Sequence, residues 1–592
     1  YAIGHACEVL QRRVADAMLA GAVNSADDLL VHIGFCALKA LSKSGQSRPM
    51  HRGADGLVPA SGAGLLLLKR LDDARRDGDR IWAVIRGVGL GNDGRGRGFL
   101  APSVAGQRRA MQQAYDVSGL KPQQIGLIEC HATGTQVGDK TEIESTAAVF
   151  AGCVDVPIGS LKSNLGHLVT AAGVAGMLKA IAALNHRTVP PSLHTDAPID
   201  ALTATPFTLV ADARPWPEDR PLRAAVSAFG FGGNNAHVLI EAAELTPETA
   251  HSDRSAASAR VSTPPQDAED LVVVGVGCAV GEGEELADFA AHLREPPAPF
   301  RGRADHVRAP VAGLGVPPRD LQRALPQQLA IVRAALAALE HAPGAREHVV
   351  SATIGMGCDP AVSRHAARWR LPERAARLGI TDRAWLDAAR EGFVDALDPA
   401  ALLGCMPNIP ANRLNHHLGL DGPSLTVSAE ERSGLAALDV ARGLLRSGRA
   451  EVALVGAVDF SCEAVAQRAA ALCADTGPSG DAAVVFVVTT PALAALRGWS
   501  VHAHLQSAVE PPPTSDSAWV DRLRGKFGKA HAAWGWVQVA AAIVENAGDP
   551  AKKRVIQITS VGGVQQSVTV AGGAAPLSLA KRSRTQNEQP RS

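Results

Sequence analysis

The chain has 592 residues, of which 46% are hydrophobic and 20% charged, with 59 basic side chains against 59 acidic ones. The composition is that of a folded protein, and the length exceeds one hydrophobic core, which predicts about two to four domains. Balanced charge excludes a large basic surface for nucleic acid, and the apolar stretches fall short of the roughly 18–20 residues that span a bilayer, so we expect neither nucleic-acid nor membrane binding. Nine scattered cysteines without a C-x-x-C pair indicate reduced thiols and a cytoplasmic protein.

The opening residues have a helical pattern and are repeated later in the chain. Residues 6–24 align without a gap with residues 441–459, with seven identities in nineteen positions. Such an internal repeat predicts two related domains. Glu431 lies ten residues before Ala441, and its equivalent in the first copy falls five residues before Tyr1. Because Tyr1 enters a helix directly, without an initiator methionine or a signal-like start, we expect a piece of a longer protein.

The first half of the chain alternates predicted strands with predicted helices. We expect helices over residues 104–119 and 171–183, and strands over residues 17–23, 62–70, 82–90 and 124–132. This alternation is typical of layered α/β domains.

Composition marks the domain boundaries. Residues 244–270 are rich in Ser, Pro, Ala and charge, which predicts a linker. A continuous apolar run follows at 271–278, as expected for a buried strand that begins a new domain. We therefore predict domains over residues 1–243 and 271–573, and a disordered polar tail over 574–592.

Three stretches dense in small and polar residues follow predicted strands, at 129–139, 159–173 and 227–237. Loops of this kind on a rigid scaffold commonly carry functional sites. His131 and His167 are 36 positions apart with no third ligand at zinc spacing, so no metal site is predicted. A dinucleotide site at the GLGNDG stretch, 89–94, is also not expected, since no helix with an acidic residue about twenty positions on follows it. We interpret the isolated histidines as structural: His5, His32 and His51.

The motifs in these stretches resemble the signature set of the β-ketoacyl synthases, condensing enzymes with the thiolase fold. The likeness rests on HATGT with His131, KSNLGH with Lys162 and His167, and GFGGNNAH with Phe231. It extends over residues 1 to about 243 and implies an α/β fold with two thiolase-like domains, each layered αβαβα. The first domain would lack its N-terminal half and its nucleophile, and the second would be degenerate. We expect the two to pair as a ketosynthase and chain-length-factor pseudo-dimer, as in polyunsaturated fatty acid synthases.

The resemblance also implies roles for individual residues. A cysteine ahead of Tyr1, at the head of the helix that residues 1–11 continue, would hold an acyl group as a thioester. His131 and His167 would donate hydrogen bonds to the malonyl thioester oxygen as the enolate forms, and Lys162 would orient and polarise them. The backbone N–H of Phe231 would complete the oxyanion hole while its ring gates acyl entry.

Two threonines and one departure from the family pattern complete the first site. Thr133 and Thr135 match positions that touch the phosphopantetheine arm of an acyl carrier protein, the only cofactor implied. Ala132 stands where the family usually has glycine, which predicts a slight shift of that loop.

The second copy keeps the fold pattern and loses the chemistry. Residues 410–427 resemble the stretch that leads into the family nucleophile, but Glu431 stands in place of the cysteine. Aligning 525–535 with 163–173 places Lys529 at the position of His167. From Ser61 to Gly166 is 105 positions and from Ser479 to Gly528 is 49, so 56 residues including the His131 loop are missing. Residues 559–570 echo 227–238 without the phenylalanine. We expect this copy to complete the pocket of its partner.

Together these features predict decarboxylative Claisen condensation of acyl and malonyl thioesters carried on acyl carrier protein. The alternative class is a catalytically inactive ketosynthase-like scaffold, which applies if no cysteine is supplied to the first copy. Glycolipid and polyketide synthases use the same motifs, so the pathway stays open.

Overall fold

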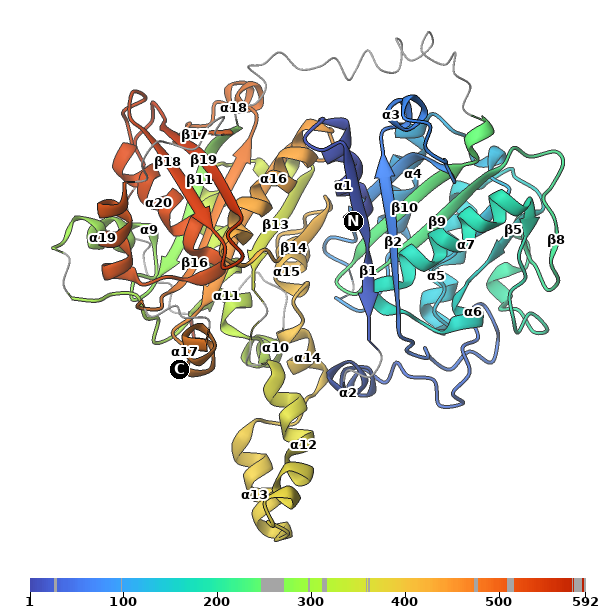
Figure 1. Cartoon of the computed structure of the whole chain (residues 1–592), viewed down its shortest axis with the longest axis horizontal. Coiled ribbons are helices and arrows are strands. Elements are labelled where there is room, and N and C mark those ends of the chain that lie inside the picture. Colours follow the sequence, from blue (N-terminus) through green and yellow to red (C-terminus); the bar gives the residue numbers. More distant parts are fainter. Residues whose placement is uncertain are drawn as a thin grey trace. The chain divides into compact units, whose positions relative to one another are not determined.

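The computed structural model describes the chain except residues 26–28, 97, 246–270, 297–298, 311–316, 358, 360–361, 473–476, 508–515, 578, 580–587 and 590–592. The chain divides into two compact units, unit 1 from Tyr1 to Thr263 and unit 2 from Pro264 to Ser592 (Figure 1). The predicted linker falls almost entirely outside the described residues. In the predicted tail, Glu588–Gln589 (β20) pairs with Ala309–Pro310 (β12). None of the described helices combines the length and the apolarity that crossing a bilayer requires.

Unit 1 contains a two-stranded ribbon and a six-stranded sheet. The ribbon is antiparallel and consists of β1 (Ala17–Asn24) and β2 (Gly62–Lys69). The larger sheet has the order β3-β10-β9-β4-β5-β7. Its strands are β3 (Val84–Asn92), β4 (Leu127–Glu129), β5 (Val156–Gly159), β7 (Phe207–Leu209), β9 (Arg223–Phe229) and β10 (Asn234–Glu241). A further short pair joins β6 (Thr188–Val189) to β8 (Arg214–Pro215).

The helices of unit 1 separate and cover these strands. α7 (Ala172–His186) contacts β2 on one side and β9 on the other, so it lies between the ribbon and the sheet. α4 (Val104–Ser118) packs on β3 and β10 and against α5 (Gln136–Val149), on the opposite face of the sheet. Alternation along the strands explains this: Leu127 and Ile128 belong to two different apolar clusters. The remaining helices are α1 (Ala2–Gln11), α2 (Leu29–Ala37), α3 (Leu71–Arg76) and α6 (Lys162–Leu165).

Most predicted elements of unit 1 are present, with two differences. The expected strand at 82–90 is found two residues later, as β3. The expected strand at 124–132 contracts to β4, three residues long. It ends at Glu129 because the N–H groups of His131 and Ala132 donate to the Glu142 carboxylate instead of to a neighbouring strand.

Unit 2 is built on one eight-stranded sheet of order β14-β13-β15-β16-β11-β17-β19-β18. The apolar run predicted to begin this domain is its strand β11. The strands are β11 (Leu271–Val280), β13 (Val350–Met356), β14 (Ser424–Val427), β15 (Val452–Phe460), β16 (Asp481–Thr489), β17 (Ala503–Ser507), β18 (Lys553–Thr559) and β19 (Gln565–Gly572).

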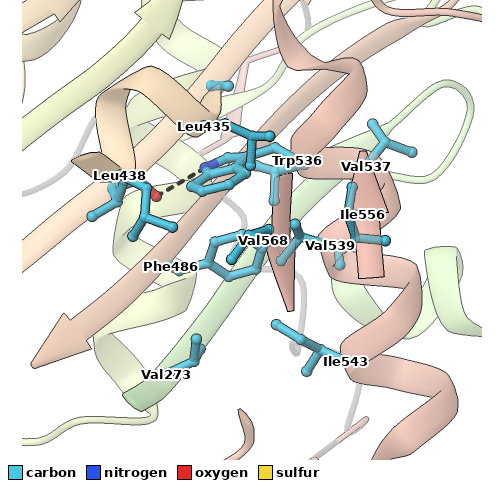
Figure 2. Close-up of a cluster of buried hydrophobic side chains, with 14 of the residues drawn as sticks. Val273, Leu435, Leu438, Phe486, Trp536, Val537, Val539, Ile543, Ile556 and Val568 are labelled. Atoms are coloured by element: carbon cyan, nitrogen blue, oxygen red, sulfur yellow. Dashed lines mark hydrogen bonds between the residues drawn. The ribbon is translucent and has the colours of Figure 1, made fainter. Parts of the chain in front are cut away.

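Helices cover both faces of this sheet. α11 (Pro326–Glu340) and α15 (Ile409–Leu418) lie on one face. α16 (Ser433–Arg446) and α20 (Trp534–Asn546) lie on the other, where Phe486 and Trp536 pack together (Figure 2). The Trp536 indole N–H donates to the Val455 carbonyl at 3.2 Å, so this fully buried tryptophan also has a partner for its polar atom.

The other helices of unit 2 lie around this frame. They are α9 (Leu286–Arg294), α10 (Pro318–Arg323), α12 (Ser363–Arg377), α13 (Arg383–Phe393), α14 (Pro399–Cys405), α17 (Ala464–Leu472), α18 (Pro491–Arg497) and α19 (Ser517–Phe527). α12 and α13 form a helical hairpin that projects away from the sheet (Figure 1).

The structure confirms the internal repeat. α1 ends at Gln11 and α16 at Arg446, a difference of 446 − 11 = 435, and β1 begins at Ala17 and β15 at Val452, a difference of 452 − 17 = 435. The same helix and the same strand therefore recur in the alignment that the sequence indicates.

Candidate active site

The fold brings His131 and His167 together. Their ring centroids are 5.6 Å apart and the ring planes are nearly perpendicular, at 81°. His131 follows β4, His167 follows α6, and the ring of Phe229 at the end of β9 lies 5.8 Å from that of His131. Three separate segments of unit 1 thus meet at one point.

A tight turn fixes the position of His167. Its backbone N–H donates to the Val58 carbonyl at 2.7 Å, and its own carbonyl accepts from the Ala60 N–H at 3.0 Å. The preceding Gly166 has φ +76°, and a Cβ there would lie 2.7 Å from the Val58 oxygen. Only glycine therefore fits without displacing the histidine.

The hydrogen bonding of His167 determines its protonation pattern. Nδ1 accepts from the Val169 N–H at 3.0 Å, so in the neutral ring Nε2 carries the hydrogen. Burial and the charge of Lys162 lower the pKa of His167 to about 3. Burial, with the same lysine and His167, also holds the pKa of His131 well below its ordinary value. Both rings are neutral at pH 7, and His167 can donate a hydrogen bond through Nε2.

Two buried carboxylates hold the His131 loop. Glu142 accepts from the N–H groups of His131 and Ala132 at 2.7 and 2.6 Å, and Asp139 accepts from those of Thr133 and Gly134 at 2.9 and 3.2 Å. Burial raises the pKa of Glu142 to about 7 and that of Asp139 to about 6, against the backbone N–H groups, which lower both.

Sequence reasoning missed these two acids. One sequence feature could have indicated them: they are three residues apart on α5, directly after the HATGT motif, so they lie on one face of the helix. Ala132 is accommodated without strain: it is buried, bonded to Glu142, and absent from the residues with positive φ.

Lys162 lies within a buried charge network beneath the histidines. It is 5% exposed. Burial lowers the pKa of Lys162, while Glu129 and Glu142 act in the opposite direction. Glu129 in turn accepts from the Leu161 N–H at 2.6 Å and from Lys179 Nζ at 2.7 Å. The lysine is placed to influence both rings electrostatically.

Thr133 and Thr135 lie on the loop between β4 and α5 that also carries His131, and Phe231 lies in the turn between β9 and β10. The Thr133 and Thr135 hydroxyls are 3.1 Å apart, just before α5 begins. Phe231 stands in the turn between β9 and β10, where Gly232 and Gly233 have φ near +90°, at +90° and +87°. Its ring packs on Phe35, 6.1 Å between centroids, and it is two residues from Phe229, which contacts His131.

Two cysteines of unit 1, Cys130 and Cys7, do not suit the nucleophile position. Cys130 is fully buried, and burial with nearby Glu142 holds its pKa far above the ordinary value, so it stays a thiol. Cys7 lies within α1 and is half-buried. Among the described residues, no three His, Cys, Asp or Glu side chains are arranged to hold a metal ion.

In unit 2, Glu431 stands at the position where the resemblance expects the nucleophilic cysteine, and it forms an ion pair. Glu431 Oε1 lies 3.1 Å from Lys529 Nζ. Lys529 follows Gly528, whose φ is +68°, and its N–H and carbonyl bond to Pro478 and Gly480 in the way that His167 bonds to Val58 and Ala60. The alignment of Lys529 with His167 is confirmed.

The structure shifts two of the alignments between the copies by two residues each, and the first is that of Ser61 with Ser479. Strand pairing makes Gly62 equivalent to Ala482, because Gly62 pairs with Asn24 and Ala482 with Asp459. From Gly62 to Gly166 is 104 positions and from Ala482 to Gly528 is 46, so the difference is 58 residues rather than 56. Two apolar strands of similar composition can be aligned in more than one way by sequence, whereas the hydrogen bonds between paired strands define which residues are opposite each other.

The second correction concerns the closing hairpins. The Gly230 N–H bonds to the Asn234 carbonyl as the Ser560 N–H bonds to that of Val564. Val561 therefore takes the place of Phe231, two residues from where the sequence comparison put it. Among the described residues, unit 2 has no counterpart of α4, β4, α5, β5 or β7, and so none of the His131 loop.

Comparisons with known proteins agree with this geometry. The β-ketoacyl synthase N-terminal domain matches residues 1–74 and 301–479, the β-ketoacyl synthase C-terminal domain matches 82–196, and the ketoacyl-synthetase C-terminal extension matches 196–275. The N-terminal domain thus matches both copies.

Among whole proteins, the chain is similar to a polyunsaturated fatty acid synthase subunit of Thraustochytrium sp., with 30% identity over 78% of this chain and 24% of that protein. It is 37% identical to a phenolphthiocerol/phthiocerol polyketide synthase subunit of Mycobacterium tuberculosis, over 59% of this chain and 22% of that protein. The chain therefore spans about a quarter of the length of these relatives.

A solved structure entitled PfaC Keto synthase-Chain length factor matches with a TM-score of 0.81 and 24% identity, over 98% of this chain and 72% of that one. This likeness confirms the thiolase-like α/β fold. The matched domains, the recurrence of one of them in both units and the fold together show that the chain belongs to the β-ketoacyl synthase family.

Proposed function

We propose that this chain is the condensing part of a larger polyunsaturated fatty acid or polyketide synthase. Unit 1 provides the condensing site, and unit 2 is a non-condensing partner of the chain-length-factor type. The names of the related synthase subunits support this assignment. The substrates are acyl and malonyl thioesters on the phosphopantetheine arm of an acyl carrier protein, and the setting is cytoplasmic.

The observation that carries the proposal is the pair of neutral imidazoles 5.6 Å apart. When the bond between the malonyl carbon and its carboxylate breaks, CO₂ leaves and the electron pair moves to the thioester oxygen. His167 Nε2–H and His131 then stabilise that enolate as hydrogen-bond donors, each contributing on the order of 3–4 kcal/mol in a water-excluded site. The lowered pKa values of both rings keep them neutral at pH 7, so each ring has one N–H to donate.

The carbon of the enolate then attacks the acyl thioester carbonyl. The new C–C bond forms as the C–S bond breaks, and the thiolate leaves. We assign the second oxyanion donor to the Phe231 N–H, because its hairpin is held beside His131 by Phe229. Thr133 and Thr135 contact the pantetheine arm in this proposal, since their hydroxyls lie together at the start of α5.

The thiolate is assigned to the position equivalent to Glu431, five residues before Tyr1. Unit 2 supports this choice, because the Glu431 carboxylate lies 3.1 Å from the residue equivalent to His167. A side chain at that position in unit 1 would likewise face the imidazoles. Glu431 itself cannot form a thioester, and this is why unit 2 is assigned a non-condensing role.

Condensation by the full-length synthase tests the proposal. His131→Ala and His167→Ala should each reduce formation of the β-ketoacyl carrier protein by about 100-fold or more, measured by mass spectrometry of the carrier. His186→Ala, at the exposed end of α7, is the matched control and should leave turnover unchanged. Undiminished turnover in either site variant, or no acyl group on a cysteine of the wild-type enzyme, would support the inactive scaffold instead.

A further inference from the structure

Unit 2 fills its own site with a side chain. Glu431 is 2% exposed. One carboxylate oxygen lies 3.1 Å from Lys529 Nζ and 3.8 Å from His531 Nδ1, and the other accepts from the Val561 N–H at 3.3 Å. Burial raises the pKa of Glu431, but its own backbone N–H and Lys529 outweigh burial and hold the pKa below the ordinary value. The group is therefore a buried carboxylate ion with a partner for each oxygen.

The partners of this carboxylate have equivalents in unit 1. Lys529 stands where His167 stands, on the same glycine turn. Val561 stands where Phe231 stands, so the N–H that bonds to Glu431 corresponds to the proposed oxyanion donor. The carboxylate thus occupies the place in which the proposed condensing site would hold a thioester carbonyl.

Replacing an imidazole by an ammonium changes what this place accepts. A neutral imidazole suits a neutral carbonyl, whereas the partly buried ammonium of Lys529 is stabilised by an anion beside it. Lys529 Nζ together with the Val561 N–H offers one cation and one directed donor, the pattern that binds a single carboxylate. A thioester oxygen cannot use the same N–H while Glu431 occupies it.

We propose that unit 2 retains a monocarboxylate-binding site whose permanent ligand is the Glu431 side chain, and that this internal ligand keeps acyl groups out of unit 2. The identification of the position rests on the proposed function of unit 1. When the side chain is removed, the site accepts a small aliphatic monocarboxylate from solution.

Chemical rescue in the full chain tests this inference. Glu431→Ala should lower the melting temperature of unit 2 by roughly 5–10 °C, because it leaves Lys529 without this carboxylate. Acetate at millimolar concentrations should restore more than half of that loss, while acetamide, which has the same shape without the charge, should restore none. Glu430→Ala, one residue earlier and exposed, is the matched control and should neither melt early nor respond to acetate.

A second variant, Lys529→Met, tests whether acetate acts through the lysine. Lys529→Met should also lower the melting temperature and should show no acetate response, and the double variant Glu431→Ala/Lys529→Met should lose less than the sum of the two losses. If Glu431→Ala does not fold, Glu431→Gln is measured against Lys529→Met in the same cycle. Additive losses, or an acetate response equal in all variants, would overturn the inference.

The two proposals fail separately. Melting of unit 2 does not depend on condensation. Absent acetate rescue together with loss of turnover in His167→Ala removes only the carboxylate site, whereas rescue together with unchanged turnover in His167→Ala removes only the condensing assignment.

Discussion

The strand pair β1–β2 of unit 1 and its equivalent β15–β16 in unit 2 have similar sequences, but the first is largely exposed to solvent and the second is buried. Leu19 pairs with Leu67 in β1–β2, and the equivalent pair in β15–β16 is Leu454 with Val487. Leu19 and Leu67 are 63% and 75% exposed, whereas Leu454 and Val487 are 0% exposed. The same strand pair is thus a surface in one copy and a core in the other.

The difference lies in what covers the strands. In unit 2, α11 packs over β15 and β16, and β13 and β11 pair with their outer edges. Among the described residues, unit 1 has no equivalent of α11, β11 or β13, and β1 and β2 pair only with each other. Exposed apolar strands with open edges are what a covering helix and neighbouring strands normally bury. The burial of a strand is therefore a property of its neighbours and not of its own residues.

Other helices are present in unit 1 and have no counterpart in the described part of unit 2. Unit 1 has α4 and α5 over its six-stranded sheet, and unit 2 has no counterpart of either among its described residues. Each unit therefore contains a different part of one fold.

A matched pair of alanine substitutions tests whether the two strand pairs differ in burial. Leu454→Ala should destabilise unit 2 by about 2–5 kcal/mol, because it removes packed methyl groups and leaves a cavity. In the 592-residue chain, Leu19→Ala should change the stability of unit 1 by no more than about 0.5 kcal/mol, because Leu19 is 63% exposed there. Urea unfolding followed by tryptophan fluorescence measures both, and equal effects would mean that the two ribbons have the same surroundings.

The shared glycine turn gives the next largest effect. Gly166→Ala and Gly528→Ala should each cost about 1–3 kcal/mol, since both positions have positive φ and a Cβ would lie 2.7 Å from the Val58 oxygen and 2.1 Å from that of Ser479. Gly152→Ala, with φ +81° but open space around it, is the control and should cost less. Equal costs at all three positions would contradict the role of close approach.

The loop that only unit 1 possesses can be tested through its anchor. Glu142→Gln should destabilise unit 1 by about 1–3 kcal/mol, because an amide can accept from only one of the two N–H groups that the carboxylate satisfies. The exposed Glu144→Gln is the control, and thermal unfolding is the measurement. An unaffected melting temperature in Glu142→Gln would show that the loop is held by other contacts.

A buried histidine gives the smallest effect, as a dependence on pH. Burial lowers the pKa of His237 to about 3, so between pH 3 and 6.5 the unfolded state binds a proton that the folded state does not. Stability from this group is complete above pH 6.5 and falls on acidification, by about 1 kcal/mol per pH unit between pH 6 and pH 4. His237→Phe should flatten the stability profile of unit 1 by that amount, and an unchanged slope would place the titration elsewhere.

Much of the candidate site could be predicted from the sequence because its residues lie in short motifs. His131, Lys162, His167 and Phe231 each belong to a glycine-rich or polar loop after a strand, and such loops meet at one edge of a sheet. Asp139 and Glu142 were not predicted, because a buried acid on a helix has the same local pattern as an exposed one. Only the fold turns them toward the His131 loop.

The repeat, the α/β pattern, the presence of Glu431 where the resemblance expects cysteine, and the alignment of Lys529 with His167 can all be read from the sequence. These features are local, and a run of neighbouring residues is enough to read them. Four features follow only from the tertiary structure: the neutral state and tautomer of His167, the two-residue shifts in register, the hydrogen bond from the Val561 N–H to Glu431, and the opposite burial of β1–β2 and β15–β16. Each of these depends on segments far apart in the chain, whose contacts set hydrogen bonding and solvent exclusion.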